Sequence, residues 1–70
     1  MNRVRAHRKL RNLTQIELAK KIGTARQTIN LIENDKYNPS LALCISLAKA
    51  LDTDLNTLFW EDEDSEGPTT

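Results

Sequence analysis

The chain has 70 residues, which is enough for one small domain, and its formal net charge is zero. A single cysteine excludes an internal disulfide, and with His7 as the other soft ligand, far away in sequence, we expect no metal site. No segment has the length and apolar character of a signal peptide or a membrane span. We therefore expect a cytoplasmic protein that does not contact a membrane.

Apolar residues recur at helical spacing along the chain, and no segment alternates long enough to predict a strand. The first helix is expected over about residues 3–11, ending at Asn12, which tolerates the left-handed conformation. Its basic residues leave two interpretations open, a solvated face or one or two contacts with phosphate. These residues are Arg3, Arg5, Arg8, Lys9 and Arg11.

A capping box predicts the start of the second helix. The Thr14 hydroxyl and the Glu17 carboxylate are spaced so that each binds a backbone amide that the helix leaves free. We expect this helix over about residues 15–22. It ends at Gly23, which takes a backbone angle that other residues resist.

The third helix is expected over about residues 26–33, “RQTINLIE”. At 100° per residue, Ile29, Ile32 and Glu33 share the side that docks on the rest of the domain. The opposite, outward side carries Gln27, Thr28, Asn30 and Leu31. Amide side chains on this side are typical of helices that contact base edges.

The segment “NDKYNPS” predicts a loop, because Asn, Asp and Pro favour turns. Ser40 is expected to cap a fourth helix over about residues 41–51, which buries one apolar stripe. The stripe consists of Leu41, Cys44, Leu47, Ala48 and Leu51. Asp54 is expected to cap a fifth helix over about residues 55–60.

Charge divides the chain into two parts. Residues 1–60 hold all ten Lys and Arg against five Asp and Glu, a net charge of +5, whereas residues 61–70, “EDEDSEGPTT”, carry −5. We expect a globular domain over residues 1–60 and an acidic, disordered tail over residues 61–70. The tail is either a solubilising end or a competitor with DNA phosphate for the basic domain.

The second and third helices, joined by a three-residue turn that opens with Gly23, have the spacing of a helix-turn-helix. The glycine lets two short helices cross steeply, so that only the outward side of the third helix faces away from the bundle. The expected fold is all-α, a compact five-helix bundle that places this side in a major groove about 12 Å wide.

The sequence resembles the Cro and phage-repressor type of helix-turn-helix regulator, the XRE family, and its short stand-alone members in particular. The resemblance covers residues 2–60 without a gap. It is carried by “NRVRAHRKLRNLTQIELAKKIG”, “RQTINLIEN”, “KYNPSLALCISLAKAL” and “DLNTLF”. It implies a lambda-repressor-like DNA-binding domain.

The resemblance also implies which residues contact DNA. Gln15, at the start of the second helix, is expected to bind a phosphate with help from the helix dipole. Gln27 and Thr28 are expected at base edges, where Gln27 can make a bidentate contact with adenine. The other expected contacts are Arg26, Asn30, Leu31, Lys36, Tyr37 and Asn38. For Leu31, packing on a thymine methyl, simple exposure and a protein contact stay open.

Further residues are expected to act in the fold or between two chains. Arg8 and Glu33 match an ion pair that ties the first helix to the third. Ala25 stands where the family usually has Ser or Thr, so it cannot cap the third helix. Asp52 stands where glycine is common. Because the family's dimers meet around the fifth helix, Leu55 and Trp60 are expected at a dimer interface. For Trp60, a simple cover over the core stays open.

The function we expect is a transcriptional regulator, a repressor that binds a palindromic operator in double-stranded DNA as a homodimer. No Ser/His/Asp or Cys/His set suggests an enzyme, and no cofactor is expected. The alternative is an antitoxin or another helix-turn-helix module that binds a partner protein, with the acidic tail as one possible contact.

Overall fold

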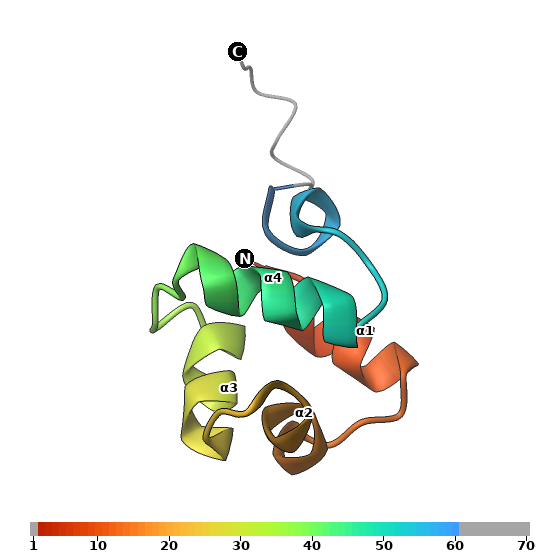
Figure 1. Ribbon diagram of the computed structural model, residues 1–70, viewed down its shortest axis with the longest axis vertical. Coiled ribbons are helices and arrows are strands. Elements are labelled where there is room, and N and C mark those ends of the chain that lie inside the picture. The colour runs from red at the N-terminus through yellow and green to blue at the C-terminus, as the bar shows by residue number, and fades with distance from the viewer. Residues whose placement is uncertain (1, 61–70) are drawn as a thin grey trace.

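The computed structural model describes residues 2–60, so the predicted acidic tail at residues 61–70 lies outside the described residues. The described part is all-helical, as the sequence predicts. Its elements are α1 (Val4–Leu10), α2 (Gln15–Ile22), α3 (Arg26–Glu33), α4 (Leu41–Ala50) and η1 (Asn56–Trp60). Figure 1 shows α2 and α3 on one side of α4 and η1 on the other.

The predicted start and end of α2 are confirmed. The Thr14 Oγ1 accepts a hydrogen bond from the Glu17 backbone N–H at 3.0 Å, and the Glu17 Oε1 accepts one from the Thr14 N–H at 2.8 Å. Gly23 follows the helix with φ of +72°. The tight turn that this angle makes is what allows α3 to pack across α2.

The ends of the other helices also follow the sequence closely. Asn12, after α1, takes φ of +58°. Ser40 caps α4 by accepting from the Leu43 backbone N–H at 3.2 Å, and Asp54 accepts from the Thr57 N–H at 2.7 Å. Ala25 lies in the extended conformation of a capping residue but makes no side-chain cap, as its methyl group requires.

The core lies where α1, α2, α3, α4 and η1 meet. It consists of Val4, Leu18, Ala19, Ile29, Ile32, Leu47, Ala48, Leu51 and Leu58. Small residues at positions 19 and 48 let the helices approach closely, since a larger side chain there would hold them apart. A core of nine buried residues within residues 2–60 leaves little reserve of stability, so single contacts between helices matter here.

The predicted apolar stripe of α4 is not buried along its whole length. Leu41 is 64% exposed, although its spacing places it on the stripe with the buried Leu47 and Leu51. It is the first residue of α4, at the exposed N-terminal end of the helix. Cys44 is only half-buried, and burial raises the pKa of its thiol.

The last helical segment differs in type from the expected α-helix. Asn56–Trp60 forms a wider π-helical turn, in which Leu58 is buried. The Leu58 carbonyl accepts a hydrogen bond from the Arg3 backbone N–H at 2.8 Å, which ties this segment to the start of α1. In so short a segment tertiary packing outweighs local helix preference, and packing is not visible in the sequence.

Asp52 adopts φ of +56°, the left-handed conformation that glycine would take more easily. Its carboxylate forms an exposed ion pair with Arg11 at 3.2 Å, between the end of α1 and the turn after α4. The turn therefore has the backbone conformation that a glycine would give. Asp52 adopts this conformation at a cost in free energy, because it carries a Cβ atom.

Candidate nucleic-acid interface

The outward side of α3 is a polar surface, as the helical spacing predicts. Ile29 and Ile32 are fully buried against the bundle. On the opposite side Arg26, Gln27, Asn30 and Leu31 are exposed and Thr28 is partly exposed. Leu31 is 39% exposed, so it is an accessible apolar group among polar neighbours.

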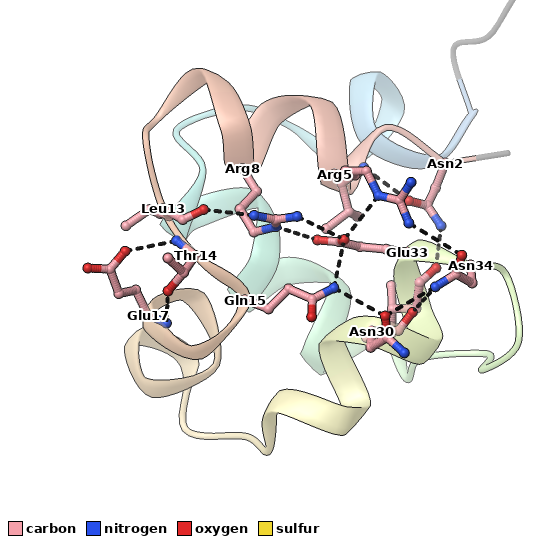
Figure 2. Close-up of polar contacts among 12 residues, drawn as sticks. Asn2, Arg5, Arg8, Leu13, Thr14, Gln15, Glu17, Asn30, Glu33 and Asn34 are labelled. Atoms are coloured by element: carbon pink, nitrogen blue, oxygen red, sulfur yellow. Dashed lines mark hydrogen bonds and ion pairs between the residues drawn. The ribbon is translucent and has the colours of Figure 1, made fainter.

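A buried ion pair fixes α3 to α1 (Figure 2). The Arg8 Nε lies 2.6 Å from the Glu33 Oε2, and the Arg8 Nη2 donates to Oε1 at 3.2 Å. Arg8 also donates through Nη1 to the Leu13 carbonyl at 2.8 Å, so it joins α3 to the connection before α2. The pair places Arg8 behind the outward side of α3.

Two further partners of Glu33 were missed by the sequence analysis. Arg5 lies 3.4 Å from the carboxylate, and the Gln15 Nε2 donates to it at 3.1 Å. Burial raises the pKa of the Glu33 carboxyl, but hydrogen bonds from Arg8, Gln15 and Arg5 and the charge of Arg8 outweigh this effect, so the pKa is lowered. Glu33 is therefore an ionised carboxylate at neutral pH.

Gln15 lies at the start of α2, as predicted, but its side chain turns inward. Besides its bond to Glu33, the Nε2 donates to the Asn30 Oδ1 at 3.3 Å. The predicted phosphate contact of Gln15 stays a prediction, and in this pose the side-chain N–H groups are turned to Glu33 and Asn30.

Arg26 lies close to the start of α2. A shallow depression is lined by basic side chains, by the Thr14 cap and by Gln15; its basic members are Arg8, Lys9 and Arg26. This basic depression brings positive charge from α1 and α3 to the N-terminus of α2. Positive charge and the N-terminal end of a helix dipole are both suited to an anionic ligand.

The loop after α3 exposes the three residues predicted there, Lys36, Tyr37 and Asn38. The loop is held at its start by Asn2, whose Nδ2 donates to the Ile32 carbonyl at 2.7 Å and to the Asp35 Oδ1 at 3.0 Å. These contacts fix the loop at the C-terminal end of α3. Lys36 is thereby placed beside the helix that presents the amide side chains.

An apolar groove lies between α4 and η1. Its apolar members are Pro39, Leu41, Cys44, Leu55, Phe59 and Trp60. Trp60 is 60% exposed. Ile45, which lies one turn after Leu41 on α4, is 39% exposed. The two residues predicted at a dimer interface, Leu55 and Trp60, therefore lie in one accessible apolar surface.

The described residues carry neither a cluster of metal ligands nor a membrane span. Within residues 2–60 no three His, Cys, Asp or Glu side chains are placed to hold a metal ion. None of the helices in this range is both long and apolar enough to cross a bilayer.

Comparison with known sequences gives a consistent result. A family model described as helix-turn-helix matches residues 4–58. An uncharacterized HTH-type transcriptional regulator of Methanocaldococcus jannaschii is 44% identical over 63 residues, covering 90% of this chain and 96% of that protein. The immunity repressor protein of Bacillus phage phi105 is 40% identical over 60 residues, covering 86% of this chain and 42% of the repressor.

The fold has a close counterpart among solved structures. A chain in a SinR protein/SinI protein complex matches this structure with a TM-score of 0.78 and 30% sequence identity. The match covers 97% of this chain, which spans 65% of the length of that chain.

Proposed function

Because the chain belongs to the XRE-type helix-turn-helix family of transcriptional regulators, we propose that it represses transcription from a palindromic operator as a homodimer. Its family is one of DNA-binding regulators and not a class of enzymes. The observation that carries the proposal is the outward side of α3, where exposed amide side chains stand on a helix anchored from behind by Ile29, Ile32 and the Arg8–Glu33 pair.

In the proposed complex α3 lies in the major groove. Gln27 is placed to bind adenine through both ends of its amide, and Leu31 to pack on a thymine methyl. Lys36, Tyr37 and Asn38 contact the backbone beyond the end of α3, and the basic depression binds phosphate at the start of α2. This arrangement divides base contacts from phosphate contacts along one face of the domain.

Selection of binding sites from random DNA tests the proposal. We expect a palindrome whose half-sites lie about 34 Å apart, one turn of the double helix. Gln27→Ala should reduce the free-energy difference between the preferred base and the other bases at one position by about 1–3 kcal/mol. Lys36→Ala is the control, and it should weaken binding to all DNA sequences alike. Absence of any enriched sequence would refute the proposal.

The apolar groove between α4 and η1 is the surface that we propose for the second copy. An exposed tryptophan beside aliphatic residues is typical of an interface anchor. Leu41→Asp should convert the dimer to a monomer, because it places a charge in this groove. Leu10→Asp, at a leucine that is 74% exposed on α1, is the matched control and should leave the dimer intact. Sedimentation velocity distinguishes the two outcomes.

A partner protein is the second candidate for the same groove. The observation that favours it is the structural match with a chain solved in complex with another protein, the SinI protein. If the isolated chain sediments as a monomer and still selects a single half-site, the groove is available to such a partner. An antitoxin role belongs to this candidate.

A further inference from the structure

A chain of hydrogen bonds connects the buried Glu33 to the exposed Asn30 (Figure 2). The Gln15 Nε2 donates to the Glu33 Oε1 at 3.1 Å and to the Asn30 Oδ1 at 3.3 Å. From the other side, the Asn34 Nδ2 donates to the Asn30 backbone carbonyl at 2.8 Å and to the same Oδ1 at 3.3 Å. Two amide groups therefore bind one side-chain oxygen.

The chemistry of the partners decides which end of each amide faces Asn30. An ionised carboxylate only accepts, so Gln15 must turn its NH2 group toward Glu33. Arg5 only donates, and its Nη2 donates to the Asn34 Oδ1 at 3.3 Å. Both Gln15 and Asn34 thus present N–H groups to Asn30, which must present its oxygen to them.

The consequence lies at the surface of α3. A carbonyl oxygen has two lone pairs, and the Asn30 Oδ1 already accepts two hydrogen bonds. The Asn30 Nδ2 has no hydrogen-bond partner among residues 2–60, and the residue is exposed on the outward side. A bidentate contact with adenine needs both the oxygen and the nitrogen of an asparagine, and only the nitrogen is available here.

We propose that Asn30 is a donor-only contact that prefers guanine to adenine and rejects cytosine. The proposal rests on the DNA-binding function above. In the major groove guanine offers two neighbouring acceptors, N7 and O6, for the Asn30 NH2. Adenine offers N7 beside an amino group that this NH2 cannot bind, and cytosine presents only an amino group. Gln15 and Asn34 are positioning residues, because they act on the base only through Asn30.

Gln27 provides an internal comparison on the same helix. Its side chain is exposed and makes no hydrogen bond within the described residues. Both ends of its amide are available, so it keeps the preference for adenine. Two amide side chains three residues apart are thus expected to select opposite kinds of base edge.

The test is selection of binding sites with the full chain and three variants. Asn30→Ala identifies the position that Asn30 contacts, because discrimination there is lost. Asn30→Asp keeps the inward oxygen and replaces the outward NH2 with an oxygen, so preference should change about tenfold toward adenine or cytosine. The double variant Gln15→Met with Asn34→Ala frees the Asn30 oxygen, so a bidentate contact becomes possible and preference there should change from guanine toward adenine. In both cases the position contacted by Gln27 should stay unchanged.

Several results would overturn the proposal. Wild-type enrichment of adenine at the Asn30 position would do so, as would an Asn30→Ala variant that weakens all sequences equally, since that marks a phosphate contact. An unchanged base preference in Asn30→Asp, with the thermal unfolding curve intact, would also contradict it. If the wild-type protein enriches no sequence, the proposed function itself fails; enrichment with adenine at this position refutes only the donor-only role.

Discussion

At the scale of single residues, the two arginines that meet Glu33 differ in burial and geometry. The Arg8 side chain is 11% exposed and lies 2.6 Å from the carboxylate, whereas that of Arg5 is 47% exposed and 3.4 Å away. Arg8→Met leaves a buried carboxylate without its main partner and should lower the free energy of unfolding by about 3 kcal/mol. Arg5→Met should cost less than about 1 kcal/mol, because solvent screens an exposed pair.

Urea denaturation of both variants checks this difference. Methionine keeps most of the apolar length of arginine, so loss of packing contributes little to either value. Equal losses in the two variants would show that the geometry of the Arg8 pair is not what stabilises the contact between α1 and α3.

Glu33 also makes stability depend on pH. Its pKa is lowered in the folded protein from the ordinary value of 4.5, so its contribution is complete above that pH and is lost as the pH falls further. Wild-type protein should therefore lose stability below about pH 4.5. Glu33→Gln should be less stable at pH 7 and lose less on acidification.

Thermal unfolding of both proteins from pH 7 to pH 3 measures the difference. Some acid dependence should remain in Glu33→Gln, because hydrogen bonds from Thr57 lower the pKa of the Asp54 carboxyl as well. Parallel curves for the two proteins would assign the acid sensitivity to groups other than Glu33.

At the scale of helices, the two members of the helix-turn-helix begin differently. Thr14 caps α2 with a complete capping box, whereas Ala25 begins α3 with suitable backbone angles, φ of −86° and ψ of 150°, and no cap. Ala25→Ser should therefore stabilise the domain by about 1 kcal/mol. Thr14→Ala should destabilise it by a similar amount, and chemical denaturation measures both changes.

Ala25→Ser and Thr14→Ala should change the free energy of unfolding in opposite directions. If Ala25→Ser destabilises the protein, the start of α3 has another partner for its free amides. If the serine variant gains stability and keeps its operator affinity, the absent cap is a stability cost that DNA binding does not need.

The helices were predictable where local chemistry decides the structure. Capping by Thr14 and Ser40 and the turn at Gly23 depend on neighbours within a few residues, and the structure confirms all three. The π-helical turn of Asn56–Trp60 and the exposure of Leu41 depend on packing between distant segments. No periodicity contains that information.

The candidate interface shows the same division. The outward positions of Gln27 and Leu31 follow from helical spacing alone. The inward turn of Gln15 follows from its distance to Glu33, 18 residues later, and from a carboxylate that needs additional donors. The sequence did pair Arg8 with Glu33, but through resemblance to a family and not through any local pattern.

At the scale of the whole molecule, the formal net charge of zero is the sum of a basic part and an acidic part of the sequence. Residues 1–60 carry a net charge of +5 and residues 61–70 carry −5. Deletion of residues 61–70 should raise affinity for non-specific DNA severalfold at low salt, because DNA then meets only the basic part. The gain should shrink as salt increases, since screening weakens both attractions.

Fluorescence anisotropy with a random duplex at two salt concentrations measures this effect. The control replaces the five acidic residues of the tail with Asn and Gln, which keeps its length. If the deletion variant binds the random duplex no more tightly than the full chain at low salt, the acidic residues do not compete with DNA. A solubilising role is then the remaining interpretation of residues 61–70.

The hydrogen bonds that link Asn30 through Gln15 to Glu33 also bear on how new binding specificities can arise. Gln27 and Leu31 make no hydrogen bonds through their side chains within residues 2–60, so a change at either costs the fold little. A change at Asn30 disturbs partners in α2 and at the end of α3. Divergence among descendants of this protein, and any attempt to direct it to a different operator, should therefore proceed first at positions 27 and 31, with position 30 changing only together with position 15.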